Sequence, residues 1–327
     1  MKLIKTTEAV GHVLCHDLTQ IIKGVSKDAK FRKGHIVTEE DIPVLLSMGK
    51  DHLYVWEKTE GMLHEDEAAQ ILYDMCKNDH MTPSEVKEGK IELIAAVDGV
   101  LKIDVDRLKA VNSLGEMMIA TRLTNTPVKK GDKIAGTRII PLVIEKEKME
   151  KAVEVAGKEP LMDIIPYKAK KVGIVTTGNE VFYGRIKDTF GPVIREKLSA
   201  FDVDVIGQTI CNDDSEKIRA AIMEFIDQGA DLICCTGGMS VDPDDTTPGA
   251  IKSTGADVVS YGAPVLPGAM FLLAYYGDKK IPIVGLPGCV MYAKRTIFDV
   301  ILPRLMADEE ITNDDLAELG HGGLILQ

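Results

Sequence analysis

The stretch DLICCTGGMSVDPDDTTPGAI, residues 231–251, decides the fold of the second half of the chain. Its apolar strand pattern runs directly into Gly237 and Gly238, and then into the paired carboxylates Asp244 and Asp245. Glycines lack Cβ atoms, so backbone N–H groups can approach a phosphate closely, and carboxylates bind a magnesium ion that phosphates share. The stretch indicates a turn built for an anion beside a metal. Taken alone, it also fits an ordinary solvated turn.

The flanking sequence favours the anion-binding interpretation. Apolar runs and helical patterns alternate between Lys171 and Met306. The strand-like runs are KVGIVTT, VDVIGQTI, DLICC and IPIVGL, and the helical ones are KDTFGPVIREKLSAF, SEKIRAAIMEFIDQ and residues 292–305. Such alternation is typical of βαβ units whose largely parallel sheet is covered on both faces. We therefore expect an α/β fold in this half, with three α/β/α layers of which the middle one is a mostly parallel sheet.

Polar or glycine-bearing loops follow four of the predicted strands. Open α/β sheets bind ligands beyond the carboxyl ends of their strands. The loops at these ends contain TTGNE (176–180), NDD (212–214), TGG (236–238) and LPG (286–288). We expect them to meet at one edge of the sheet and to form the binding site there.

The motifs TTGNE, GRIKDT, ICNDD, TGGMSVDPDDTTPGAI and LPG, in this order, resemble the molybdopterin-binding domain shared by MogA, MoeA, MoaB and gephyrin. The resemblance covers Lys171 to about Met306. It implies a domain that holds the phosphate of molybdopterin or of its molybdenum-loaded form. It also implies that the domain uses Mg²⁺, ATP or AMP, and molybdate in molybdenum cofactor biosynthesis or insertion.

The resemblance also implies roles for individual residues. Glu180, Asp213 and Asp245 fall on the family's acidic positions, so they are the expected catalytic residues. Asp213 and Asp245 are in addition the expected magnesium ligands, and Asp244 is expected to be a solvated neighbour. The expected cofactor-binding residues are Thr176, Thr177, Gly178, Asp188, Thr189, Gly237, Gly238, Ser240, Pro287, Gly288, Cys289 and Lys294. Lys294 is expected one turn into the helix that follows LPG.

Some positions depart from the MoeA pattern. MoeA proteins have two lysines in a KPGKP segment thought to contact molybdate, whereas residues 266–270 read LPGAM. The LPGNPVSA loop of that branch becomes LPGCVMYA, so Cys289 replaces an asparagine. A thiol there could touch a soft metal or simply fill the space of the asparagine. Because an oxyanion needs positive charge or donors to offset its desolvation, the sequence favours pterin binding over MoeA-type metal insertion.

Three function classes follow from these observations. The first is a molybdopterin-binding protein that acts as a molybdenum- or adenylyl-transferase. The second is a nucleotide pyrophosphatase of the CinA type, because that family also has a GG turn followed by DDxT, as in residues 244–247 here. The third is a cofactor carrier or sensor without catalytic activity, which the missing lysines favour. The long N-terminal extension counts against the CinA interpretation.

Composition bounds the setting and the partners. A net charge of −12 argues against non-specific binding to nucleic acid or to an anionic membrane. The six cysteines form no CxxC pair, and no secretory segment is evident, so we expect a reduced, cytoplasmic protein. The expected partners are the pterin, molybdate and an apo-molybdoenzyme. The resemblance further implies a homo-oligomer.

Before Lys171 we expect a β-rich α+β region. Short strands and a helix ending at Gly49 are predicted for residues 2–56, a helix for residues 65–78, and strands for residues 90–144. A charged run follows and is predicted to be a helix or a hinge. The expected bounds are 1–60 for a small N-terminal region, 61–165 for a middle domain with its linker, 166–310 for the molybdopterin-binding domain and 311–327 for a C-terminal tail.

One N-terminal cluster, His12, Cys15, His16 and Asp17, could ligate a transition metal. Alternation along a strand would, however, place His12 and His16 on one face and the other two residues on the opposite face. A strand edge with a polar face is therefore the favoured interpretation.

Overall fold

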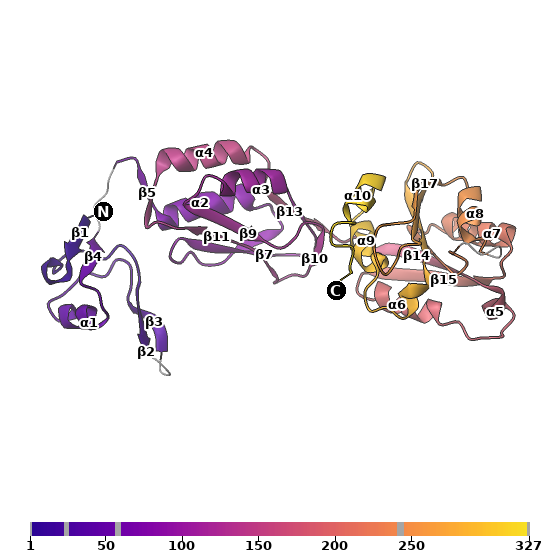
Figure 1. The fold of residues 1–327 in the computed structure, drawn as a ribbon, viewed down its shortest axis with the longest axis horizontal. Coiled ribbons are helices and arrows are strands. Elements are labelled where there is room, and N and C mark those ends of the chain that lie inside the picture. The colour runs from indigo at the N-terminus through magenta and orange to yellow at the C-terminus, as the bar shows by residue number, and fades with distance from the viewer. Residues whose placement is uncertain (1, 23–25, 56–59, 241–244, 326–327) are drawn as a thin grey trace. The chain divides into compact units, whose positions relative to one another are not determined.

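The computed structural model describes residues 2–22, 26–55, 60–240 and 245–325. Its contacts divide the chain into two compact units, Met1–Ile164 and Ile165–Gln327, whose elements are labelled in Figure 1. In the described ranges we find no helix with the length and apolar character needed to cross a membrane.

The first unit begins with short strands around a small core. Strand β1 (Lys2–Lys5) pairs with β4 (His52–Val55), and β2 (Leu18–Ile22) pairs with β3 (Ser26–Phe31), both antiparallel. Helix α1 (Asp41–Ser47) ends before Gly49, whose φ of 74° is typical of a residue that follows a helix. Leu14, Leu45 and Leu53 are buried between these elements.

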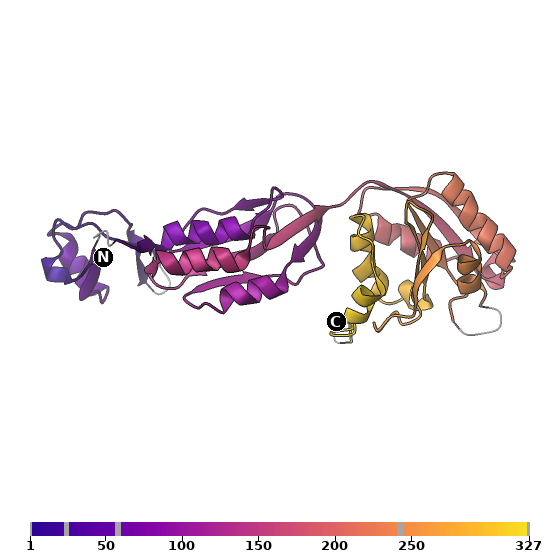
Figure 2. The ribbon, with the colours of Figure 1, turned by 90° about the horizontal axis from the view of Figure 1, so that it is seen from above.

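An antiparallel sheet in the order β6–β7–β11–β9 forms the middle of the first unit. Helices cover one face of it (Figure 2), because alternate strand residues such as Ile91 and Leu93 point into the shared core. The strands are β5 (Met62–His64), β6 (Met81–Pro83), β7 (Lys90–Ala95), β8 (Gly99–Ile103), β9 (Met117–Thr121), β10 (Thr126–Val128), β11 (Lys133–Ile139), β12 (Val143–Glu145) and β13 (Met162–Pro166), and the helices are α2 (Glu65–Cys76), α3 (Val105–Asn112) and α4 (Lys146–Ala156). The β-rich α+β prediction for this region is confirmed. The charged run is the helix α4, which buries Met149 and Ala152 in this core.

In the described residues, the sheet of the second unit has the order β15–β14–β16–β19–β18–β17. Strands β14 (Lys170–Thr177), β15 (Val203–Cys211), β16 (Leu232–Thr236) and β19 (Ile281–Leu286) are mutually parallel. Strand β18 (Leu272–Tyr276) runs the other way between β19 and β17 (Asp257–Tyr261). The hairpin loop from β17 to β18 therefore emerges at the edge where the parallel strands end.

Helices lie on both faces of this sheet. Helices α6 (Phe190–Leu198) and α9 (Ile297–Met306) share one apolar cluster with β14 and β16, whereas α7 (Ser215–Asp227) and α8 (Thr247–Ser253) share the other. Continuous apolar runs in the central strands make this possible, because both of their faces are buried. The predicted three-layer α/β/α fold is confirmed.

One predicted helix begins later than expected. Residues Gly288–Met291 form a single 3-10 turn, and α9 begins only at Ile297. Thr296 caps α9: its N–H and its hydroxyl donate to Asp299 Oδ2 at 2.7 and 3.0 Å. The expectation that Lys294 lies one turn into a helix is therefore wrong, since Lys294 precedes the cap.

The N-terminal His/Cys cluster does not lie on one regular strand. Val13 and Leu14 form isolated bridges with Ile36 and Val55, while Cys15 is buried and its carbonyl oxygen is 2.8 Å from His64 Nε2. The ranges that the structure describes contain no group of three or more His, Cys, Asp or Glu residues placed to hold a metal ion.

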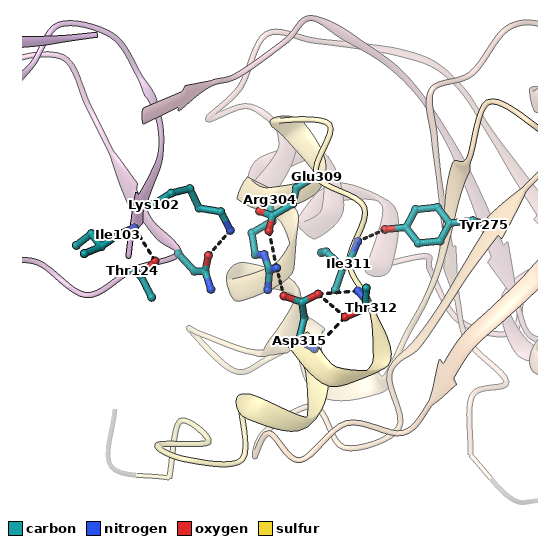
Figure 3. A network of polar contacts seen from close by, with 10 residues as sticks. Lys102, Ile103, Thr124, Tyr275, Arg304, Glu309, Ile311, Thr312 and Asp315 are labelled. Atoms are coloured by element: carbon teal, nitrogen blue, oxygen red, sulfur yellow. Dashed lines mark hydrogen bonds and ion pairs between the residues drawn. The ribbon is translucent and has the colours of Figure 1, made fainter. Parts of the chain in front are cut away.

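A buried arginine fixes the C-terminal segment to the second unit (Figure 3). Arg304 of α9 is 1% exposed, and its Nη2 donates to Glu309 Oε1 at 2.6 Å and to Asp315 Oδ1 at 2.5 Å. Asp315 lies in α10 (Asn313–Glu318) and also accepts from the N–H and hydroxyl of Thr312. Burial by itself raises the pKa of Asp315, but the Thr312 and Arg304 hydrogen bonds outweigh it and lower this pKa to about 2.

We predict that Asp315→Asn lowers the free energy of unfolding of the second unit by about 2 kcal/mol at pH 7. A carboxyl whose folded pKa is depressed to about 2 contributes stability above its unfolded pKa and loses it as the pH falls through the folded value. The difference between wild type and variant should therefore shrink to roughly half at pH 3. Urea denaturation at both pH values measures it. Asp314→Asn, on an exposed side chain of the same helix, is the control, and equal effects of the two substitutions would contradict the prediction.

Candidate functional site

The loops after the parallel strands leave the second sheet side by side. Thr176 is in register with Thr236, and Thr177 with Cys211. Thr236 in turn pairs with Leu286. The ends of β15, β14, β16 and β19 therefore form one edge, and the four polar loops begin there.

The turn after β16 requires glycine at position 237 and favours it at position 238. Gly237 and Gly238 have φ angles of 87° and 52°, in the left-handed region that favours glycine. A Cβ on Gly237 would lie 2.2 Å from the carbonyl oxygen of Thr177, and one on Gly238 would lie 3.0 Å from the hydroxyl oxygen of Thr247. The turn thus packs directly against the end of β14 and against Thr247 at the start of α8.

Buried threonines lie beneath this turn. The hydroxyl oxygens of Thr177 and Thr247 are 2.9 Å apart, and the Thr236 hydroxyl donates to Thr176 Oγ1 at 3.3 Å. All four side chains are buried. Their hydrogen bonds join the end of β14 to the end of β16 and to the start of α8, so the base of the site is polar and fixed.

Two of the three predicted acids lie beside the glycine turn. Asp213 Oδ2 accepts from Asn179 N at 3.0 Å, and the Asp213 carbonyl accepts from the Thr246 hydroxyl at 3.1 Å. Residue 245 adjoins Thr246, and the Asp245 Cα would be 3.6 Å from a Cβ on Gly238. Asp213 and Asp245 therefore belong to adjoining segments, and Asp244 lies outside the described residues.

Glu180 occupies the other side of the loop after β14. It is exposed in the short helix α5 (Asn179–Phe182), and its Oε1 lies 2.7 Å from where a Cβ on Gly178 would be. Gly178 has a φ of 137°, and its N–H donates to the Cys211 carbonyl at 3.2 Å. This backbone contact couples the loops after β14 and β15.

A second polar group centres on Gln208, for which the sequence patterns give no signal. Gln208 Nε2 donates to Thr176 Oγ1 at 3.0 Å and to Asp188 Oδ2 at 2.7 Å. Asp188 Oδ1 also accepts from the N–H groups of Phe190 and Gly191 at the start of α6. Gln208 thereby links the predicted residues Asp188 and Thr176, and only the strand pairing brings it to them.

Tyr261 is another residue that sequence reasoning missed. Its hydroxyl donates to the carbonyls of Met239 and Ser240 at 2.8 and 3.2 Å. This holds the segment after the glycine turn to the last residue of β17. Ser240 itself is exposed.

The loop after β19 completes the edge. The Thr189 hydroxyl donates to Met291 Sδ at 3.1 Å, which brings the segment before α6 to this loop. Pro287 is buried, Gly288 and Lys294 are exposed, and Cys289 is half-buried. Burial raises the pKa of the Cys289 thiol.

The hairpin loop between β17 and β18 lies beside the start of α9. The N–H of Ile297 donates to the Pro267 carbonyl at 3.3 Å, and a Cβ on Gly268 would be 2.5 Å from Ile297 Cγ2. Leu266 and Ala269 of this loop are exposed.

Comparison with known families agrees with this geometry. Residues 173–307 match the family described as "Probable molybdopterin binding domain", so the second unit carries a molybdopterin-binding domain of the MoaB/Mog type. Residues 3–57 match a domain of unknown function, DUF8806.

Several individual proteins are similar to parts of the chain. A CinA-like protein of Mycobacterium avium is 42% identical over 77 residues, which are 24% of this chain and 18% of that protein. A CinA-like protein of Mycobacterium tuberculosis is 40% identical over the same length and share. The match thus spans less than a fifth of these relatives.

Two solved structures are similar to parts of the chain. MoaB of Thermus thermophilus has 23% identity and a TM-score of 0.35, and the match covers 43% of this chain and 98% of that one. MoeA of Pyrococcus horikoshii has 16% identity and a TM-score of 0.36, with coverages of 75% and 79%.

We predict that Gly237→Ala destabilises the second unit by about 2–4 kcal/mol, because the methyl group would displace a backbone carbonyl and would require an unfavourable φ. Gly249→Ala is the matched control. A Cβ on Gly249 of α8 meets nothing within 4 Å, so that substitution should be neutral or stabilise by up to about 1 kcal/mol. Chemical denaturation of both variants measures the difference. Similar stabilities would show that the turn does not pack as described.

Proposed function

We propose that the second unit binds molybdopterin through its phosphate and acts in molybdenum cofactor biosynthesis or insertion, as an adenylyl- or molybdenum-transferase that uses Mg²⁺ with ATP or AMP. The family match of residues 173–307 supports the pterin. The observation that carries the proposal is the glycine turn, whose packing against Thr177 leaves no space for side chains. An apo-molybdoenzyme would be the receiver of the product, and a homo-oligomer the working form.

The residues present fit an anion with a shared magnesium ion. Left-handed glycines turn successive backbone N–H groups toward one point, which is how phosphates are held without nearby lysines. In a chain of net charge −12, such local donors are the means of binding an anionic ligand. Magnesium is held by one or two carboxylates plus phosphate oxygens, and Asp213 and Asp245 supply that number.

Roles for the residues follow from their contacts. Gly237 and Gly238 would hold the phosphate, and the buried Thr177 and Thr247 would keep the turn in shape. Asp213 would keep the loop after β14 in place through the N–H of Asn179 and would supply a carboxylate to the magnesium ion. A magnesium ion bound there would neutralise charge that develops on the transferred phosphoryl group. Glu180 would orient the attacking group from the exposed side.

A second candidate function is hydrolysis of a nucleotide pyrophosphate. The similarity to CinA-like proteins of mycobacteria favours it, as does the DDTT sequence at residues 244–247. The same glycine turn would hold the phosphate and the same carboxylates, Asp213 and Asp245, would hold magnesium, with water as the attacking group. A carrier or sensor without activity is the third candidate, and the exposed Leu266 and Ala269 in place of lysines favour it.

One experiment separates these candidates. The protein is purified from cells that make the cofactor and denatured, and the released pterin is measured by its fluorescence after oxidation. The apo-protein is then incubated with ATP or with ADP-ribose and magnesium. Released pterin with ATP turnover supports the transferase, ADP-ribose turnover without pterin supports the hydrolase, and pterin without turnover supports the carrier.

For a transferase or hydrolase, we predict that Asp245→Asn lowers magnesium-dependent turnover by roughly a hundredfold or more, whereas pterin affinity changes little. The amide keeps the shape of the side chain but removes the charge that holds the metal. Initial rates at several magnesium concentrations measure the loss. Asp257→Asn, an exposed carboxylate on β17, serves as the control and should leave the rate unchanged. A rate of Asp245→Asn equal to wild type would rule out the proposed metal ligand.

The loop at residues 266–270 gives a further prediction. Wild-type protein should bind molybdate weakly, and the double variant Leu266→Lys, Ala269→Lys should bind it at least about tenfold more tightly, because each cation adds a charge-assisted contact. Titration calorimetry measures both affinities. Val105→Lys with Leu123→Lys places two cations on exposed positions of the first unit and controls for net charge. Tight binding by wild type would contradict the prediction.

A further inference from the structure

Two large aromatic side chains are exposed directly after the loop that follows β14. Phe182 is 43% exposed and Tyr183 is 60% exposed. Their rings are in edge-to-face contact, with centroids 5.2 Å apart and planes at 84°. Phe, Trp and Tyr make up only 5% of the residues of this chain, so an adjacent exposed pair is uncommon in it. Such a pair is a surface on which a planar ring can stack.

Two cations accompany these rings. Arg185 Cζ lies 5.3 Å from the centroid of the Tyr183 ring, and Lys217 Nζ lies 5.9 Å from that of Phe182. Both distances are within the range of a cation–π contact. Lys217 Nζ is also 3.9 Å from Asp214 Oδ2, so Arg185 supplies the positive charge at the Tyr183 ring. This charge favours a ligand whose ring carries negative charge elsewhere in the same molecule.

The backbone ties this surface to the candidate site. The N–H groups of Phe182 and Tyr183 donate to the carbonyls of Gly178 and Asn179 at 2.9 and 3.0 Å. The N–H of Asn179 donates in turn to the Asp213 carboxylate. Gly178 directly follows Thr177, against whose carbonyl Gly237 packs. The helical turn that carries the rings is thus joined through the backbone to the loop after β14 and to Asp213.

We propose that Phe182, Tyr183 and Arg185 form a subsite for the planar heteroaromatic ring of the phosphorylated ligand, with the ring stacked on Tyr183 while the phosphate lies at the glycine turn. This inference rests on the proposed function and adds the means by which the ring is recognised. A pterin and an adenine share the chemistry that such a surface selects, namely a flat, nitrogen-containing aromatic ring. Ribose 5-phosphate has the phosphate but lacks the heteroaromatic ring.

The test compares ligands with and without the ring on the full-length protein. Calorimetry measures affinities for AMP, for the oxidised phosphorylated pterin released from a molybdoenzyme, and for ribose 5-phosphate. Tyr183→Ala should weaken binding of at least one ring-bearing ligand about tenfold, the usual effect of losing one stacking side chain, and should change ribose 5-phosphate binding by less than twofold. A loss with the pterin alone, or with AMP alone, identifies which ring the subsite takes.

Two further variants keep the result interpretable. Tyr183→Phe retains the ring and should bind every ligand within twofold of wild type. Tyr54→Ala removes an exposed tyrosine from β4 of the first unit and should change nothing. Two results would contradict the subsite while leaving phosphate binding at the glycine turn in place, provided that wild type binds the ring-bearing ligands. In the first, Tyr183→Ala binds those ligands as tightly as wild type. In the second, Tyr183→Ala loses affinity for ribose 5-phosphate to the same extent as for the ring-bearing ligands. If wild type binds none of the three ligands, the proposed function falls and the subsite with it.

Discussion

The close approach of Gly237 to the carbonyl of Thr177 is the constraint on which the rest of the site depends. The 2.2 Å left for a Cβ is less than any real side-chain atom accepts, so the loops after β14 and β16 are in backbone contact. That contact buries the threonine hydroxyls, which must then bond to one another because buried polar groups need partners. The two glycines also put no Cβ between their own N–H groups and a bound anion, which is a requirement for holding it through the backbone.

Backbone donors and acidic side chains have separate places in this unit. The donors belong to glycines and to strand ends in the sheet core, whereas the acidic residues Asp213 and Asp245 lie on adjoining loop segments. Preorganised dipoles need not reorganise when a ligand binds, so they stabilise an anion even in a protein of net charge −12. The carboxylates would repel the same anion unless a cation lay between them, so a magnesium requirement is a natural expectation of the arrangement.

Sequence patterns were sufficient to predict the layers of the second unit. They were insufficient to predict the side-chain hydrogen bonds between its elements. Alternating apolar runs and helical stretches specify a parallel sheet, and the carboxyl ends of parallel strands must share an edge. Gln208 was not predictable, because its bonds to Asp188 and Thr176 depend on which strands are neighbours. The same holds for Tyr261 on β17. The start of α9 was misplaced because Thr296 and Asp299 define it through a local cap that the apolar pattern does not reveal.

The reversed strand β18 has a consequence for how such a domain can diversify. Its direction places the hairpin loop of residues 262–271 at the rim of the site, although this loop carries none of the motif residues. A hairpin connection can change its side chains without moving the parallel strands that hold the cradle. Substitutions in this loop can therefore change the side chains near the site while the glycine turn after β16 keeps its structure. The LPGAM segment, residues 266–270, lies in this loop, and its Leu266 and Ala269 side chains are exposed.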